Sequence, residues 1–173
     1  MKISDKHIKA IEELIPKKDQ QKFVDNAIEK ELKKYKIENS EIFEVYCDGG
    51  SRGNPGAAGG GFGLYRGGKL VLKGSEFFGE RTNNQAEYLS LRLALRETYS
   101  KFGDVKLHCF MDSEFVVKQM KGEYKVKNAN IKPLYDEVRQ ITEQFSSFKI
   151  SHVRREQNQL ADMMANEAMD RRA

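Results

Sequence analysis

Four acidic residues of this chain occupy positions from which their side chains could act together on a phosphate ester. Asp48 and Asp112 each directly follow an apolar run that is typical of a strand, and ligand sites in open α/β sheets lie beyond the ends of strands. Glu87 and Asp162 each fall within a segment of helical pattern. One such acid alone would be an ordinary solvated side chain. Four of them, on strand ends and flanking helices, are expected to converge.

Carboxylates that converge repel one another, and they stay ionised together only when a cation joins them. A ligand set made of oxygen atoms, without Cys or His, indicates Mg²⁺, for which Mn²⁺ can substitute. Two such ions can activate a water molecule and stabilise the leaving oxygen in the hydrolysis of a phosphodiester. The four acids therefore predict a site for two divalent ions and a metal-dependent nuclease.

A glycine-rich segment begins at the first of these acids. The sequence DGGSRGNPG predicts a turn over Asp48–Gly60, in which the backbone could approach a ligand closely. A hairpin or a bulge is the alternative interpretation. The segment is not a phosphate-binding P-loop, because GxxxxGK[ST] is absent, and no helical pattern follows it as in a dinucleotide-binding motif.

The elements that must position the acids follow an α/β order from residue 41 onward. The first three strands are expected to form an antiparallel meander, and the later strands, separated by helices, are expected to run parallel. The predicted fold class is α/β, with a mixed five-stranded sheet flanked by helices. The expected strands are 42–47, 61–65, 70–78, 105–111 and 148–153, and the expected helices are 82–99, 113–120, 131–145 and 157–171.

The first 40 residues differ from the rest, because they contain no glycine and are rich in Lys and Glu. Their apolar spacing predicts a helical hairpin over 1–40, broken at Pro16 and joined by a linker, 36–40, to a domain over 41–173. Two short helices cannot bury both apolar faces, so we expect a homodimer or docking on the main domain. The faces are Ile8, Ile11, Leu14 and Ile15, and Phe23, Val24, Ala27, Ile28 and Leu32.

Composition sets broad limits on the protein class. The 173 residues are 39% hydrophobic and 32% charged, which is typical of a globular protein. No apolar run approaches the roughly 20 residues that span a bilayer, and no secretory signal is apparent, so we expect a cytoplasmic protein without membrane association. The net charge of +4 permits a polyanionic partner but does not require one. Cys47 and Cys109 are expected to be buried thiols, with a disulfide or a metal pair as the alternative.

Four motifs resemble those of the type 1 ribonuclease H family, in the compact form found in archaea and some bacteria. They are CDGGSRGNPG, RTNNQAEYLSL, FMDSEFVVKQM and REQNQLADMMANEA, in this order, over about residues 42–170. The resemblance implies a ribonuclease H-like fold, cleavage of the RNA strand of RNA/DNA hybrids, and two metal ions held by the four acids. It does not cover the N-terminal 40 residues, which are unlike the usual hybrid-binding module of the family and faintly resemble the helices of ribbon-helix-helix dimers.

The same resemblance implies a set of substrate contacts. Some of them would reach the ribose 2′-hydroxyl, which distinguishes RNA from DNA. By this match, Asn54, Asn83 and Asn84 touch the substrate near the cleaved strand, Thr82 and Asn128 hold a DNA phosphate, Asn158 lies beside the acids, and Tyr124 lies along the DNA strand.

Two assignments leave alternatives open. Many bacterial members carry a histidine in a loop before the last acid, but the short segment 153–158 has none. We expect Arg155 to replace it in part, at the scissile region or the product, while a solvated charge or a phosphate contact is the alternative. For Tyr124 the alternative is packing in the core.

Other functions on the same fold are also compatible with the sequence. A non-catalytic nucleic-acid-binding protein is one, although a binding protein has no need to keep a repulsive cluster of four acids. A nuclease that acts on double-stranded RNA or on junctions is another, and the sequence does not separate it from a hybrid nuclease.

Overall fold

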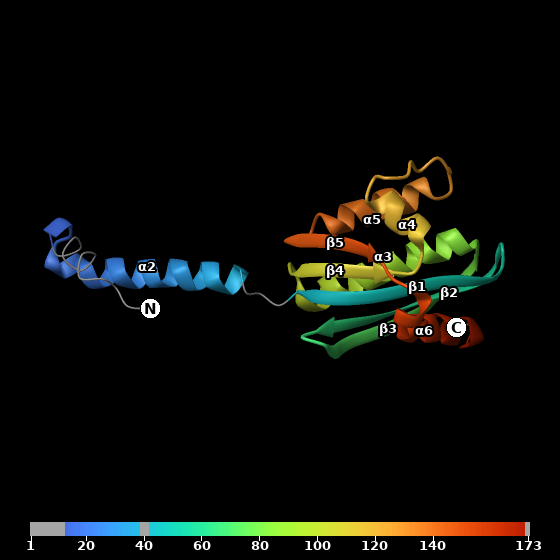
Figure 1. Ribbon diagram of the computed structural model, residues 1–173, viewed down its shortest axis with the longest axis horizontal. Helices are drawn as coiled ribbons and strands as arrows, with labels where there is room; N and C mark the ends of the chain where they lie inside the picture. The colour runs from blue at the N-terminus through green and yellow to red at the C-terminus, as the bar shows by residue number, and fades with distance from the viewer. Residues whose placement is uncertain (1–12, 39–41, 172–173) are drawn as a thin grey trace. The chain divides into compact units, whose positions relative to one another are not determined.

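The computed structural model describes residues 13–38 and 42–171 of the chain. The chain divides into two compact units, residues 1–40 and 41–173, and each is described by itself. Figure 1 shows the elements of both. No helix in the described ranges is long and apolar enough to cross a membrane.

The N-terminal unit contains one long helix, α2 (Lys17–Glu38). It begins directly after Pro16, where the sequence predicted a break, while the expected first helix lies almost wholly outside the described residues. The expected linker 36–40 is wrong over its first three residues, because α2 continues through them without a glycine or proline to stop it. The side chains of Phe23 and Ile28 on this helix are each 49% exposed.

The second unit is built on a five-stranded sheet in the order β3-β2-β1-β4-β5. The pairs β1–β2 and β2–β3 are antiparallel, and β1–β4 and β4–β5 are parallel, so the predicted mixed α/β fold is confirmed. The strands are β1 (Phe43–Gly53), β2 (Gly56–Arg66), β3 (Lys69–Arg81), β4 (Lys106–Met111) and β5 (Ser147–His152); the helices are α3 (Asn83–Phe102), α4 (Glu114–Met120), α5 (Lys132–Thr142), the 3₁₀ turn η1 (Arg155–Gln157) and α6 (Gln159–Arg171).

The two faces of the sheet are covered by different helices. The helices α3, α4 and α5 enclose the main core on one face, and α6 packs on the opposite face over β2, with further contacts to β1 and β3 (Figure 1). Side chains alternate along β1, so that Val45 and Cys47 point into the core. Tyr46 and Asp48 point to the other face, which α6 covers only in part.

The predicted glycine-rich turn over Asp48–Gly60 is wrong, because most of it is strand, and the alternative interpretation of a hairpin is confirmed. β1 continues as far as Gly53 and β2 begins at Gly56, with the two strands paired throughout. Asp48 therefore lies within a strand rather than after one. The prediction failed because glycine is common in loops and rare in strands.

Glycine is needed here because helices approach these strands very closely on both faces. A Cβ atom at Gly49 would lie 2.2 Å from the backbone oxygen of Ala86 in α3. One at Gly61 would lie 2.4 Å from the Cβ atom of Met164 in α6. The missing side chains thus let α3 and α6 rest on the strand backbones, next to Asp48.

The two cysteines are free and buried in neighbouring strands, as the sequence predicted. The Sγ atoms of Cys47 and Cys109 lie 3.7 Å apart. The hydrogen bond between the two thiols, together with burial, raises the pKa of Cys47 well above its usual value.

Candidate active site

The four predicted acids line one open pocket of about 280 Å³. Each comes from a different element: Asp48 from β1, Glu87 from α3, Asp112 from the end of β4, and Asp162 from α6. The structure thus brings together carboxylates that the sequence places far apart.

Asp48 and Asp112 meet because their strands are parallel neighbours. Tyr46 of β1 pairs with Phe110 of β4, and each acid lies two residues further along on the same face. The two carboxyl groups lie within hydrogen-bonding reach of each other. Burial, followed by the negative charges of Asp112 and Asp162, raises the pKa of Asp48 to about 7.

Glu87 is held against the same pair from the second turn of α3. Thr82 fixes the start of that helix, because its Oγ1 accepts a hydrogen bond from the backbone N–H of Gln85, whose side chain accepts from the Thr82 N–H in return. Burial raises the pKa of Glu87, and the charges of Asp48 and Asp112 raise it further. Its Oε2 atom is buried and has no hydrogen-bond partner in the described part of the chain.

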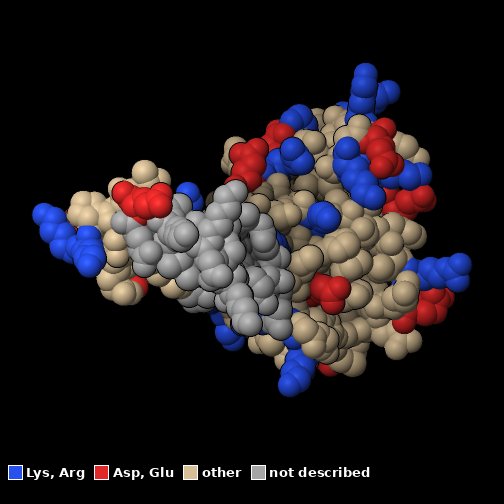
Figure 2. All heavy atoms as spheres, turned by 60° about the vertical axis from the view of Figure 1, so that its left-hand side comes forward, with Lys and Arg blue, Asp and Glu red and all other residues tan. Residues whose placement is uncertain are grey.

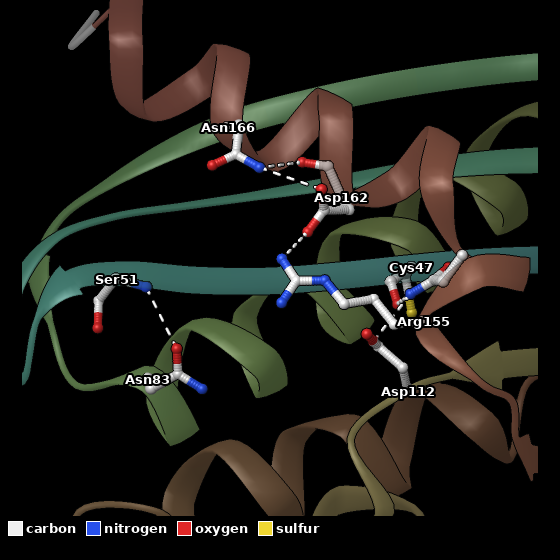
Figure 3. A network of polar contacts seen from close by, with 8 residues as sticks. Cys47, Ser51, Asn83, Asp112, Arg155, Asp162 and Asn166 are labelled. Atoms are coloured by element: carbon white, nitrogen blue, oxygen red, sulfur yellow. Dashed lines mark hydrogen bonds and ion pairs between the residues drawn. The ribbon is translucent and has the colours of Figure 1, made fainter.

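Asp162 is engaged on both carboxylate oxygens, as Figure 3 shows. Nη2 of Arg155 donates to Oδ1 over 2.6 Å. Nδ2 of Asn166, one turn further along α6, donates to Oδ2 over 3.3 Å. The predicted Arg155 therefore lies in the pocket, with its guanidinium on an acid.

Asn158 lies beside the acids, where the resemblance placed a polar residue. Its side chain is only 1% exposed, and its Nδ2 donates both to the backbone oxygen of Cys47 and to Oδ1 of Asp112, over 3.1 and 2.9 Å. Asn158 thus joins the beginning of α6 to the two strands that carry acids.

Asn83 and Asn54 are tied to each other at the edge of the pocket. Asn83 lines the pocket, and its Oδ1 accepts from the N–H of Ser51 over 3.3 Å. Its own N–H donates to Oδ1 of Asn54 over 3.1 Å. The turn between β1 and β2 is thereby fastened to the start of α3, where Thr82 and the exposed Asn84 also lie.

Tyr124 and Asn128, two of the predicted substrate residues, do not line this pocket. Tyr124 is 47% exposed, and the ammonium of Lys118 lies 5.0 Å from its ring centre, so the alternative of core packing is wrong. Asn128 is exposed in the segment before α5, where its Oδ1 accepts from the N–H of Asn130. Their contacts with a substrate stay predictions.

The carboxylates are suitable ligands for a hard divalent ion, although their oxygen atoms do not converge on a single position. In the ranges that the structure describes, no three carboxylate, imidazole or thiol groups converge tightly enough to hold an ion. Burial, followed by the charges of neighbouring acids, raises the pKa values of Asp48 and Glu87, so ionising these acids together is unfavourable without a cation. An all-oxygen, partly buried donor set with an unpartnered Glu87 oxygen fits Mg²⁺ or Mn²⁺.

Charge is mixed on one face of the molecule. On the face drawn in Figure 2, Lys and Arg side chains are interspersed with Asp and Glu rather than gathered in a patch of one sign.

Comparisons with known proteins agree with this geometry. A family model described as reverse transcriptase-like matches residues 47–168. The ribonuclease HI of Halobacterium salinarum is 40% identical over 127 residues, which are 73% of this chain and 63% of that protein. The crystal structure of RNase H1 from the same archaeon matches with a TM-score of 0.73 at 37% identity, over 75% of this chain and 98% of that chain. The chain belongs to the type 1 ribonuclease H family.

A further member of the type 1 ribonuclease H family, LC11-RNase H1, was solved in complex with an RNA/DNA hybrid. It matches with a TM-score of 0.71 at 38% identity, over 75% of this chain and 97% of its own. Ribonucleases H in general depend on divalent metal ions. The chain spans about 63% of the length of the Halobacterium protein, and the family model begins at residue 47, after the N-terminal unit.

Two residues of this ribonuclease H site were missed in the sequence. Asn166 could have been found, because it lies four residues after Asp162 and so on the same face of α6. Ser113 is the N-cap of α4. Its hydroxyl also donates a hydrogen bond to Glu87, and this bond opposes the rise in the pKa of Glu87. The capping role follows from local sequence, but the contact with Glu87 depends on the fold.

Proposed function

We propose that this protein is an endonuclease that hydrolyses the RNA strand of RNA/DNA hybrids. The observation that carries the proposal is the pocket in which Asp48, Glu87, Asp112 and Asp162 gather from four elements. The proposal is supported by the similarity to a ribonuclease HI and to a ribonuclease H1 solved with a hybrid. The cytoplasmic location expected from the sequence stays a prediction.

The four acids would hold two divalent ions. These would be Mg²⁺, for which Mn²⁺ can substitute. Such ions, when bound, activate water as a nucleophile and stabilise charge on the leaving oxygen. The chain itself supplies a fixed frame: Asn158 and Ser113 orient Asp112 and Glu87 by hydrogen bonds. Hydrolysis of this kind leaves a 5′-phosphate and a 3′-hydroxyl on the RNA.

The residues around the acids would place the substrate. Asn83 is exposed at the edge of the pocket and is held by Ser51 and Asn54, so its amide is positioned to meet a ribose hydroxyl. Thr82 and Asn128 would hold a phosphate of the DNA strand, and Tyr124 would lie along that strand. These contacts extend the proposal beyond the pocket.

The deciding experiment incubates labelled RNA/DNA hybrid, double-stranded RNA and double-stranded DNA with the protein, each with Mg²⁺, Mn²⁺ or EDTA. We expect cleavage of the RNA in the hybrid with either ion and none in EDTA. Cleavage in excess EDTA, or products with 2′,3′-cyclic phosphates, would contradict the mechanism. Binding without cleavage would favour a non-catalytic protein, and preferred cleavage of double-stranded RNA would change the substrate.

We propose that the N-terminal unit joins two copies of the chain. This is supported by the half-exposed Phe23 and Ile28 on α2 and by Leu14, which is 81% exposed, because soluble proteins usually cover such faces. Two active sites in one particle would bind a long hybrid more tightly through effective concentration. Light scattering on the full chain and on a variant without residues 1–40 tests this. A monomeric full chain at micromolar concentration would contradict it and favour docking on the catalytic domain.

A further inference from the structure

Arg155 is a cation held directly on one of the four acids. Its guanidinium pairs with Asp162 at 2.6 Å, and Figure 3 shows the side chain extending across the front of β1. The hydrogen bond to Asp162 and the charge of that residue raise the pKa of Arg155, and the charges of Asp48 and Asp112 add to the effect. The arginine therefore interacts with three of the four carboxylates and neutralises part of their charge.

Asp162 has no carboxylate oxygen left without a donor. Oδ1 accepts from Arg155 and Oδ2 accepts from Asn166. A divalent ion that takes Asp162 as a ligand must therefore share these oxygens with two donors that already occupy them. The positively charged partner opposes the ion more strongly, because two cations at one carboxylate repel each other.

The backbone of Arg155 is anchored, whereas its side chain is largely exposed. Its carbonyl oxygen accepts a hydrogen bond from the N–H of the buried Asn158 over 2.9 Å. The side chain of Arg155 is 73% exposed, and exposed ion pairs are held only weakly in water. The guanidinium can thus leave Asp162 without disturbing the turn that carries it.

We propose that Arg155 is a built-in competitor of the divalent ion at Asp162. The guanidinium occupies the carboxylate when no ion is bound, and it leaves when an ion binds. Arg155 thereby sets the ion concentration at which the last of the four acids becomes a ligand. The inference rests on the proposed function only in taking the acids as ligands of a divalent ion.

Calorimetric titration of the metal-free full chain with Mn²⁺ alone tests the competition without any nucleic acid. Arg155→Ala should lower the Kd for Mn²⁺ about two- to tenfold, because it removes an exposed ion pair and adds net negative charge to the pocket. Arg155→Lys keeps the charge and should stay closer to the wild-type Kd. An unchanged or higher Kd in Arg155→Ala overturns the proposal.

Arg52 provides a matched control in the same pocket. It also lines the pocket, but it pairs with Asp170 at 2.6 Å instead of with one of the four acids. Arg52→Ala removes the same charge without releasing Asp162, so the Kd for Mn²⁺ should change less than in Arg155→Ala. An equal decrease in the Kd for Mn²⁺ in both variants would show a general effect of charge. It would overturn the proposal that Arg155 competes directly with the ion.

A second control removes the carboxylate for which the two cations compete. In an Asp162→Asn background, the further change Arg155→Ala should tighten Mn²⁺ binding less than it does in the wild type, because only its charge effect on Asp48 and Asp112 remains. Equal tightening in the two backgrounds contradicts the proposal. Hybrid cleavage by the wild-type protein tests the proposed function, whereas the Kd for Mn²⁺ tests the competition at Asp162. A failure of one proposal can therefore be distinguished from a failure of the other.

Discussion

The side-chain amide of Asn158 donates a hydrogen bond to the carboxylate of Asp112 over 2.9 Å, from a position that is almost fully buried. The same nitrogen also donates to the backbone oxygen of Cys47, directly before Asp48. One amide therefore fixes the relative position of two acids that come from different strands.

Asn158→Ala should lower kcat for hybrid cleavage about 10- to 100-fold, which is typical of the loss of a group that orients a metal ligand. The KM for the hybrid should change little, because Asn158 is only 1% exposed and its Nδ2 is bonded to Asp112 and to the backbone of Cys47. Steady-state kinetics and Mn²⁺ titration measure the two effects. Val138→Ala, a core truncation in α5, controls for lost stability and should keep kcat; an equal loss of kcat in both variants would contradict the positioning role.

Asp48→Asn and Asp112→Asn should each abolish cleavage while the protein stays folded. Each change removes a proposed metal ligand but also relieves repulsion within the Asp48–Asp112 pair. In EDTA at pH 7, we expect both variants to melt no lower than the wild type. Thermal unfolding followed by circular dichroism measures this, and near-normal activity in either variant would show that the site is placed wrongly.

The stabilising effect of Asp48→Asn should depend on pH in a defined direction. Folded Asp48 keeps its proton up to about pH 7, whereas the unfolded residue releases it near 3.8. The folded wild type thus binds more protons in this interval, and its stability falls as the pH rises through it. The advantage of Asp48→Asn in melting temperature should therefore grow from pH 4 to pH 7 in EDTA. A difference in melting temperature between the two proteins that stays constant from pH 4 to pH 7 would contradict this prediction.

Gly49→Ala should destabilise the protein by about 1–3 kcal/mol through overpacking against α3. The added Cβ would lie 2.2 Å from the backbone oxygen of Ala86, which cannot move without the helix. Gly50→Ala is the matched control, because its Cβ would meet nothing closer than 3.8 Å. Urea denaturation should show a clear loss of unfolding free energy in the first variant and a change within about 0.5 kcal/mol in the second. Equal effects would mean that α3 does not press on the strand.

The thiols of Cys47 and Cys109 should not react with a disulfide reagent in the native protein. Both are buried, and the raised pKa of Cys47 keeps it protonated, while the thiolate is the reactive form. Labelling with Ellman's reagent should proceed only after denaturation. Rapid labelling of either thiol at neutral pH would be incompatible with the structure.

Local pattern was sufficient for some parts of the site. Asp112 follows a strand whose apolar alternation ends at Met111, and Thr82 begins α3 as its N-cap. Each of these features is encoded within a few neighbouring residues, and each could therefore be predicted without the fold.

Other parts of the site depend on residues distant in the sequence. Asp48 lies inside a strand because β1 pairs with β2 as far as Gly53, whereas the glycine-rich composition favoured a turn. The hydrogen bond between Asn158 and Cys47 joins residues 111 positions apart. Such relations arise from tertiary packing, which no local periodicity records.

The order of the elements also governs when the site can exist during folding. Asp48 enters with the first strand of its unit, whereas Asp162 enters with α6, the last helix described. Contacts between segments so distant along the chain carry a large loop-closure entropy and tend to form slowly. The four acids can therefore lie together only once α6 has docked over β2. Recovery of nuclease activity during refolding would then report the docking of that helix.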